Sequence, residues 1–427
     1  MKKQGSILCL ISHRRGVISV MKNIEKTKTQ AAGTLVTPKG FHAAGLHSGV
    51  KRKRNDLGVI YCEQPAQAAA VYTMNQVKAA PIYVTKESIE EGQQLQAIIV
   101  NSGNANACMG EQGMQDAYKM REVTANKLGV QENDVAVAST GVIGIPMPMD
   151  KIVPHIEKLK LGQTKMEADA FAESILTTDT FSKSVCCETE IDGETVTMAG
   201  VAKGSGMIEP NMGTMLGFLT TDAVIEADML QLALKESVDE TFNCITVDGD
   251  TSTNDMVITM ASELAGNHSL TPDHPEWGKF VELMKSVSQG LSQAIARDGE
   301  GATKLIEVEV SGAESDLAAR KVAKTITASS LVKTAIFGSD ANWGRFIVAV
   351  GYSGETIDPQ NIDMSIGSLP LLQKSEPVEF SEEEAKAYLQ NETINIYVDL
   401  NIGNGSGKAW GCDLTYDYVR INASYRT

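Results

Sequence analysis

The chain lacks the marks of a metal-binding, membrane-spanning or nucleic-acid-binding protein. Its six histidines form no group with the ligand spacing of a zinc site, and its seven cysteines include no CxxC pair. No apolar stretch is long enough to span a bilayer. The formal net charge of −16 argues against nucleic acid and anionic membranes as partners, because both need a basic surface. We therefore expect small-molecule partners, with no metal, no nucleic acid and no membrane.

The cysteines also lack the pattern of a disulfide framework. Their number is odd, and the adjacent Cys186 and Cys187 would form only a strained vicinal disulfide. We interpret both as free thiols, which indicates a reducing compartment. The sequence therefore predicts a cytoplasmic protein.

The first 24 residues have no acidic side chain and carry five Lys or Arg. Their apolar run, 7–11, is too short for the core of a secretory signal. Two alternatives remain, an organellar targeting segment or a dispensable extension that precedes a translation start at Met21. We favour the second and predict that residues 1–30 form a disordered extension.

The rest of the chain has the composition of a globular protein. With 427 residues, of which 42% are hydrophobic and 22% charged, it can bury a large core. Apolar runs before glycine-rich turns predict strands at 57–62, 96–100 and 134–138. Apolar periodicity predicts helices at 113–128 and 165–177. These elements indicate the mixed α/β (α+β) class.

Further elements are predicted in the second half. Residues 215–220 are typical of a buried strand. Thr221-Asp222 is typical of a helix cap. The apolar face of the helix that follows would carry Leu230, Leu234, Val238 and Phe242. Apolar residues from Phe280 to Ile295 predict a helix that ends at Asp298-Gly299, so Glu300 would lie at a helix exit. Strands are also expected at 244–248, 256–261 and 306–310, and an antiparallel pair at 393–402 and 409–421.

A glycine-rich segment at the midpoint, KGSGMIEPNMGTML (203–216), places a small flexible residue before a threonine. Such a chain can cut itself if the Thr214 hydroxyl attacks the Gly213 carbonyl and water opens the resulting ester. The freed α-amine, with a pKa of roughly 7.7–8.0, would then serve as the base for the Thr214 nucleophile. The alternative is an ordinary loop, because Gly-Thr is a common dipeptide.

The run KGSGMIEPNMGTMLGFLTTDA (203–223) resembles the signature of the ornithine acetyltransferase family of arginine biosynthesis. It departs from the family pattern at Glu209, where a small residue is usual, and at Gly213, where alanine is usual. The resemblance spans nearly the whole chain beyond about residue 30. Further matching segments are 101–108, 139–144, 177–180, 248–255, 298–304 and 413–423.

The resemblance implies a layered α/β sandwich of the ornithine acetyltransferase/DmpA-like type, with a self-processing N-terminal nucleophile. It implies cleavage into an α chain, 31–213, and a β chain, 214–427, which assemble as a heterotetramer of two α and two β chains. The implied reaction moves an acetyl group from N2-acetylornithine to glutamate through an acetyl-Thr214 ester. Many family members also accept acetyl-CoA as donor, and no cofactor is implied.

The resemblance also implies roles for individual residues. Thr214 is the nucleophile and the first residue after the Gly213–Thr214 cleavage point, and Thr140 and Gly141 form the oxyanion hole. The implied substrate-binding positions are Thr180, Lys203, Thr214, Glu300, Asn422 and Thr427.

The acidic run 248–255 does not fit a calcium-binding loop of the EF-hand type. Counted from Asp248, the sixth position is Thr253 and the twelfth is Thr259, where that loop needs glycine and glutamate. We therefore interpret the carboxylates of the run as the rim of the site.

Two other functions stay open at this point. A self-processing amidohydrolase or aminopeptidase would share the N-terminal nucleophile but use water as acceptor. A non-catalytic binding protein would keep the fold without cleavage. The set Thr180, Lys203, Glu300 and Asn422 favours amino-acid acetyl transfer over hydrolysis. The presence of Thr214, Thr140-Gly141 and Glu300 argues against the non-catalytic protein.

Overall fold

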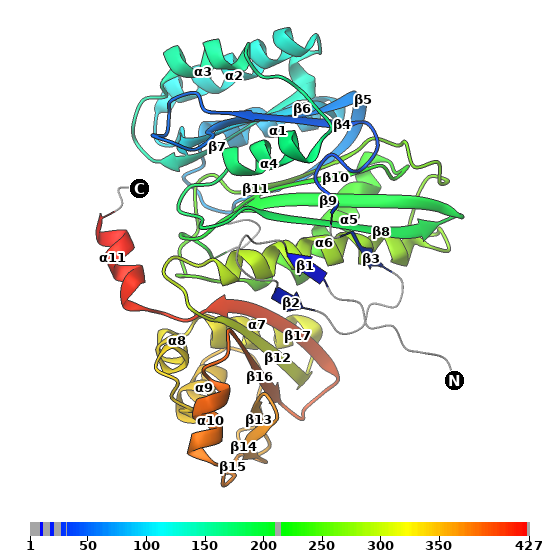
Figure 1. Cartoon of the computed structure of the whole chain (residues 1–427). Helices are drawn as coiled ribbons and strands as arrows, with labels where there is room; N and C mark the ends of the chain where they lie inside the picture. The colour runs from blue at the N-terminus through cyan, green and yellow to red at the C-terminus, as the bar shows by residue number, and fades with distance from the viewer. Residues whose placement is uncertain (1–8, 12–17, 21–26, 31, 210–214, 425–427) are drawn as a thin grey trace.

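The computed structural model describes residues 9–11, 18–20, 27–30, 32–209 and 215–424. It has two mixed sheets with helices packed around and between them, so the predicted α/β sandwich class is confirmed (Figure 1). Three predicted site residues, Gly213, Thr214 and Thr427, lie outside the described residues. Within the described ranges, no helix is both long and apolar enough to cross a membrane.

The larger sheet has nine strands in the order β3-β8-β9-β10-β11-β5-β6-β7, with β4 also paired to β5. Their bounds are β3 Lys28–Thr29, β4 Phe41–Leu46, β5 Leu57–Tyr72, β6 Gln94–Asn104, β7 Val135–Val142, β8 Lys183–Ile191, β9 Glu194–Lys203, β10 Leu216–Thr221 and β11 Met256–Ala261. The strands predicted at 57–62, 96–100, 134–138 and 256–261 are confirmed as β5, β6, β7 and β11.

The smaller sheet has six strands in the order β15-β14-β13-β16-β12-β17. Their bounds are β12 Leu305–Ala313, β13 Asp363–Ile366, β14 Leu369–Gln373, β15 Glu376–Pro377, β16 Thr393–Asp399 and β17 Gly405–Cys412. A separate antiparallel pair is formed by β1 (Cys9–Ile11) and β2 (Ile18–Val20).

The described helices include those predicted at 113–128 and 165–177. Their bounds are α1 Ala80–Gly92, α2 Gly110–Leu128, α3 Met149–Ile156, α4 Lys165–Ser174, α5 Ala227–Glu240, α6 Trp277–Arg297, α7 Asp316–Ala328, α8 Ser330–Phe337, α9 Trp343–Gly351, α10 Glu382–Tyr388 and α11 Tyr416–Ser424, with 3-10 turns at Glu132–Asp134 and Phe242–Cys244.

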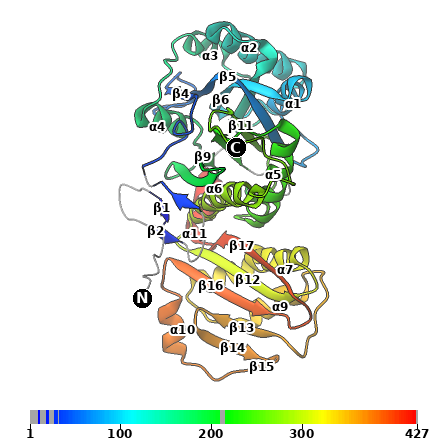
Figure 2. The same cartoon turned by 90° about the vertical axis from the view of Figure 1, so that its right-hand side faces the viewer.

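Helix α6 lies between the two sheets. It contacts β8 and β9 of the larger sheet and β12 and β17 of the smaller one, as Figures 1 and 2 both show. The predicted apolar stripe from Phe280 to Ile295 is buried, and so are Ser286 and Gln293 on the opposite side of the helix. A helix buried nearly all round is expected where two layers cover it. Its last turn therefore delivers Asp298 and Glu300 to the junction of the two sheets.

Strand β10 is the buried strand predicted after Thr214, and all six of its residues are buried. It pairs antiparallel with β9, where Leu216 faces Lys203, and parallel with β11, where Leu216 faces Met256. The carbonyl of Met215 accepts a hydrogen bond from the Met256 N–H at 3.0 Å. The chain after the predicted cleavage point is thus anchored in the middle of the sheet from its second residue.

Two local predictions in this region are wrong. Thr221 ends β10, and α5 begins at Ala227 without a side-chain cap. The Asp222 carboxylate instead accepts the main-chain N–H groups of Thr197 and Lys39. Residues 244–248 contain no strand, because the chain there runs through a 3-10 turn and a single bridge from Ile245 to Trp410.

The predicted antiparallel pair at 393–402 and 409–421 is also wrong. Strands β16 and β17 do form, but β12 lies between them, parallel to β16 and antiparallel to β17. Alternation along a strand indicates which side chains share a face but not which strand lies beside it. Residues 416–424 form helix α11, which begins where the Thr415 hydroxyl accepts the N–H groups of Asp417 and Tyr418.

The disordered extension predicted over residues 1–30 is too long at its C-terminal end. Lys28 and Thr29 pair with Glu188 and Cys187 of β8, so residues 28–29 belong to the larger sheet. Thr27 is already buried. The body of the protein therefore begins by residue 27 rather than at residue 31.

Candidate active site

A cavity of about 200 Å³ lies beside the start of β10. It is formed by the end of β7, the segment after β9, the acidic run 248–255, the turn after α6 and helix α11. Helix α11 follows β17 of the smaller sheet and extends toward the larger one (Figure 1). The predicted site residues that line this cavity are Thr140, Gly141, Lys203, Glu300 and Asn422. Segments up to 317 residues apart in the sequence (Ala105 to Asn422) thus meet at one place.

Thr140 and Gly141 lie at the end of β7, where it runs parallel to β6. Gly141 has φ +132°, and a Cβ there would lie less than 3.0 Å from the backbone of Gly103, so glycine is required. The Asn254 side chain donates to the Ser139 carbonyl at 2.8 Å and so braces the strand end. The Thr140 side chain and the Gly141 backbone are therefore held rigidly at the cavity.

The acidic run 248–255 holds the segment that leads to the predicted cleavage point. The Asp248 carboxylate accepts the N–H of Met207 at 2.7 Å and that of Ile208 at 2.8 Å. The Thr251 hydroxyl donates to the Glu209 carbonyl at 3.0 Å. Asp248, with Asp250 and Asp255 of the same run, lines the cavity, as predicted for the rim. Across the described ranges, no group of His, Cys, Asp or Glu side chains has a metal-binding arrangement.

Asp255 is a carboxyl of the predicted rim whose burial the sequence did not indicate. It is 4% exposed, and its Oδ2 has no hydrogen-bond partner among the described residues. Burial raises the pKa of Asp255 well above its usual range, although the charge of Lys203 opposes this. The cavity therefore contains a carboxyl group that favours its protonated form.

Glu300 and Asn422 meet across the cavity from two distant elements. The Asn422 Nδ2 donates to the Glu300 Oε2 at 2.7 Å, and the Glu300 N–H donates to the Ser205 carbonyl at 2.9 Å. A Cβ on Gly206 would lie less than 3.0 Å from the Glu300 carboxyl. The absence of a side chain at Gly206 thus lets this carboxylate pack directly on the segment after Lys203.

Tyr418 is a second contribution of α11 to the cavity. Its hydroxyl donates to the Asp248 Oδ2 at 3.3 Å. Burial, together with the Asp248 charge, raises the pKa of Tyr418. The sequence missed this residue because 409–421 was predicted as a strand. The spacing of Tyr418 and Asn422, four residues apart, would have put both on one face of a helix.

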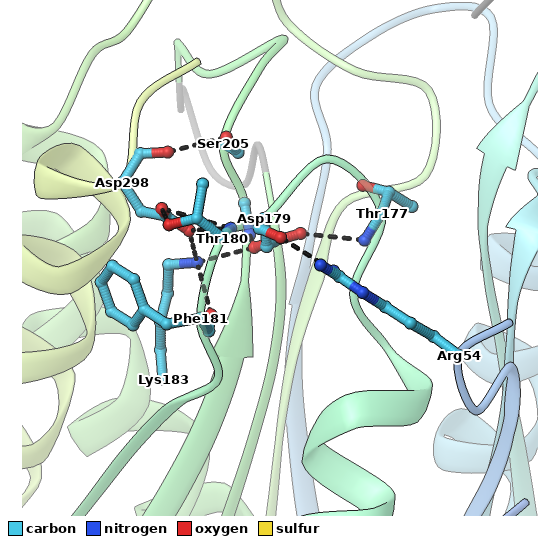
Figure 3. Close-up of polar contacts among 9 residues, drawn as sticks. Arg54, Thr177, Asp179, Thr180, Phe181, Lys183, Ser205 and Asp298 are labelled. Carbon is cyan, nitrogen blue, oxygen red and sulfur yellow. Dashed lines mark hydrogen bonds and ion pairs between the residues drawn. The ribbon is translucent and has the colours of Figure 1, made fainter. Parts of the chain in front are cut away.

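The structure does not bring Thr180 into this cavity. Thr180 lines a neighbouring depression with Phe181, Arg297 and Arg420. Its N–H donates to the Asp298 carboxylate at 3.0 Å, and its hydroxyl also donates to that carboxylate (Figure 3). Asp298 follows α6 by one residue, so Thr180 is joined to the turn that carries Glu300.

Comparisons with known proteins place the chain in a family. Residues 42–427 match the ArgJ family. The chain belongs to the ArgJ family. It is 58% identical over 410 residues to the arginine biosynthesis bifunctional protein ArgJ of Geobacillus kaustophilus, which covers 96% of this chain and 100% of that protein. It is also 58% identical over 412 residues to the protein of the same name from Halalkalibacterium halodurans, with the same coverage.

A solved structure is also similar to part of the chain. The ornithine acetyltransferase of Mycobacterium tuberculosis, in complex with ornithine, is 36% identical, with a TM-score of 0.40, and covers 43% of this chain and 98% of that one. The family resemblance expected from the sequence is confirmed by the match over residues 42–427. The roles of individual site residues stay predictions.

Proposed function

We propose that this ArgJ-family chain transfers an acetyl group from N2-acetylornithine to glutamate, which releases ornithine and forms N-acetylglutamate in arginine biosynthesis. The observation that carries the proposal is the cavity at the start of β10, which is lined by Thr140, Gly141, Lys203, Glu300 and Asn422. The relatives named arginine biosynthesis bifunctional protein ArgJ, which align with 96% of the chain, support it.

Thr214 would carry the acetyl group. Cleavage of the Gly213–Thr214 bond gives Thr214 a free α-amine, which takes the hydroxyl proton as the hydroxyl attacks the acetyl carbonyl of the donor. Ornithine leaves, and the amine of glutamate then attacks the acetyl ester. The anchoring of Met215 and β10 in the sheet supports this role, because a nucleophile works best on a rigid element.

The cavity residues would stabilise the oxyanion and bind the substrates. The Thr140 hydroxyl and Gly141 N–H would stabilise the oxyanion of each tetrahedral intermediate. Lys203 would pair with a substrate carboxylate, and Glu300, oriented by Asn422, with the side-chain ammonium of ornithine. Thr180 and Thr427 complete the proposed set of substrate-binding residues.

Acetyl-CoA is the proposed second donor, without any bound cofactor. The word bifunctional in the relatives' name supports two acetyl-transfer activities. Incubating the protein with acetyl-CoA and glutamate tests this directly. Formation of N-acetylglutamate without acetylornithine is the expected result, and its absence would limit the chain to acetylornithine.

The α chain, which ends at Gly213 and includes the paired residues 28–29, and the β chain, 214–427, are proposed to stay together after cleavage and to assemble as two of each. The continuous pairing of β9 with β10 supports their association. Cys62, Cys186 and Cys412 are among the described cysteines that form no disulfide, which supports the cytoplasm as location.

The acceptor distinguishes transfer from hydrolysis. Acetylornithine should disappear rapidly with glutamate present and slowly without it, with one N-acetylglutamate formed for each ornithine released. Equal rates with and without glutamate would make the protein an amidohydrolase instead.

An acetyl-enzyme intermediate is expected during turnover. Incubation with acetylornithine alone should add about 42 Da, the mass of one acetyl group in place of a proton, to the peptide that begins at Thr214. Mass spectrometry of acid-quenched protein measures this, and added glutamate should remove the label. Label on any other peptide would contradict the two-step scheme.

Gly206→Ala should weaken the binding of acetylornithine. The added Cβ would press on the Glu300 carboxyl, and overpacking typically costs about 1–3 kcal/mol, so we expect KM for the donor to rise by about tenfold. Steady-state kinetics with each substrate varied in turn measures this. Gly92→Ala is the matched control, because a Cβ at Gly92 meets no atom within 4 Å. An unchanged KM in the Gly206 variant would argue against a substrate-binding role for Glu300.

A further inference from the structure

A buried cluster of three charged side chains lies next to the cavity but is not part of its lining. The Lys183 ammonium is 2.7 Å from the Asp179 carboxylate and 2.6 Å from that of Asp298, and the three side chains are between 0% and 2% exposed (Figure 3). Burying such charges costs several kcal/mol per ion, and apolar side chains of similar volume are often as stable. Stability alone therefore does not account for this cluster.

Asp179 connects the cluster to the backbone after Lys203. Its Oδ1 accepts the Gly204 N–H at 2.8 Å, and its Oδ2 accepts the Thr177 N–H at 2.9 Å. Burial alone would raise the pKa of Asp179, but the charges of Lys183 and Lys203 hold it well below its usual range. The carboxylate is thus ionised and strongly accepting next to the residue proposed to bind a substrate carboxylate.

Asp298 connects the cluster to the turn that carries Glu300. The Asp298 carbonyl accepts the Ser205 hydroxyl at 2.7 Å, and the Ser205 carbonyl accepts the Glu300 N–H at 2.9 Å. Asp298 and Ser205 therefore join the turn after α6 to the segment after β9. Lys183 lies between the two carboxylates and links both connections.

The cluster also spans the predicted cleavage point. Asp179, Lys183 and Gly204 precede residue 213 in the sequence, whereas Asp298 and Glu300 follow it. After cleavage the segment from Gly204 onward is covalently attached only through Lys203. Only non-covalent contacts then hold the start of this segment, at Gly204, against the turn that carries Glu300.

We propose that Lys183 is a positioning residue for acetyl transfer, which holds the backbone of Lys203-Gly204 and the turn of Glu300 in register through Asp179 and Asp298. The proposal rests on the function proposed above, because Lys203 and Glu300 are its substrate-binding residues. Lys183 itself touches no substrate. It acts by keeping two substrate-binding side chains at a constant separation in the cut protein.

The test compares three variants of the full chain with the native protein. Lys183→Met removes the shared charge, and Asp179→Asn keeps the Lys183–Asp298 pair, so the second variant stays informative if the first fails to fold. Lys304→Met is the matched control, since Lys304 is also buried but donates to the Ile336 carbonyl at the end of α8. Each protein is assayed below its unfolding temperature, with rates expressed per folded site.

Both test variants should lose on the order of 100-fold in kcat/KM, the loss typical of a 1 Å misplacement, with KM rising for both substrates. Amide hydrogen exchange at Gly204 and Glu300 should quicken at least about tenfold, as local opening becomes easier. Lys304→Met should change neither quantity. Unchanged kcat/KM and unchanged exchange at both amides in a folded test variant would overturn the proposal. If the native protein transfers no acetyl group, the proposed function fails, while the exchange data still decide whether Lys183 holds the two segments.

Discussion

Thr214→Ala leaves the protein as a single uncut chain without acetyl-transfer activity. Alanine has no hydroxyl to attack the Gly213 carbonyl, so residue 214 never gains a free amine. Both the nucleophile and its base are then missing, and we expect kcat to fall to background. Denaturing gel electrophoresis after purification should show two bands near half the full mass for the native protein and one full-length band for the variant.

Two further variants serve as controls for this result. Thr214→Ser keeps a hydroxyl and should still be cut and remain active at a reduced rate. Gly213→Ala places the residue usual in the family before the nucleophile and should be cut at least as completely as the native chain. Turnover by an intact Thr214→Ala chain would refute the assignment of the nucleophile, and a native protein that runs as one band would refute self-cleavage.

Thr140→Val should lower kcat by about 100- to 1000-fold with little change in KM. Valine keeps the shape of threonine but removes one proposed donor to the oxyanion, and the loss of one such donor typically costs about 2.7–4 kcal/mol in the transition state. The rigid end of β7, with Gly141 and the brace from Asn254, should stay in place. Steady-state kinetics of acetylornithine and glutamate measures the effect.

Thr178→Val is the matched control, because Thr178 lines the same cavity but has no proposed role in the chemistry. We expect less than a tenfold change in its kcat, since it touches no developing charge. Equal losses in the two variants would mean that the cavity tolerates no valine. A normal kcat in Thr140→Val would place the oxyanion donors elsewhere.

The elements of the fold were predicted best where the pattern is local. The strand after Thr214 and the helix from Phe280 to Ile295 follow from runs and spacings of apolar residues within a single element. Pairing between elements is not local, and so β12 was not expected between β16 and β17. Helix α11 was not predicted because none of its side chains is buried, so its sequence contains no apolar stripe that would indicate a helix.

The candidate site was predicted through family resemblance rather than through spacing. Each matching motif is weak evidence on its own, and only the fold brings Thr140 and Asn422 to one cavity. Lys183 and Asp298 are 115 residues apart in sequence, so no sequence pattern could indicate their contact. The sequence placed Asp255 at the rim but did not indicate its burial, which depends on the packing of many segments.

The order of strands in the larger sheet constrains when the chain can be cut. Strands β10 and β11, which follow the predicted cleavage point, are inserted between β9 and β5, which precede it. All residues of β10 and β11 are buried, so a separately produced 214–427 fragment would expose two apolar strand edges at once. Such edges pair with other chains and aggregate. We therefore expect folding to come before the proposed cleavage, and the two products would be interlocked parts of one sheet rather than two separable domains.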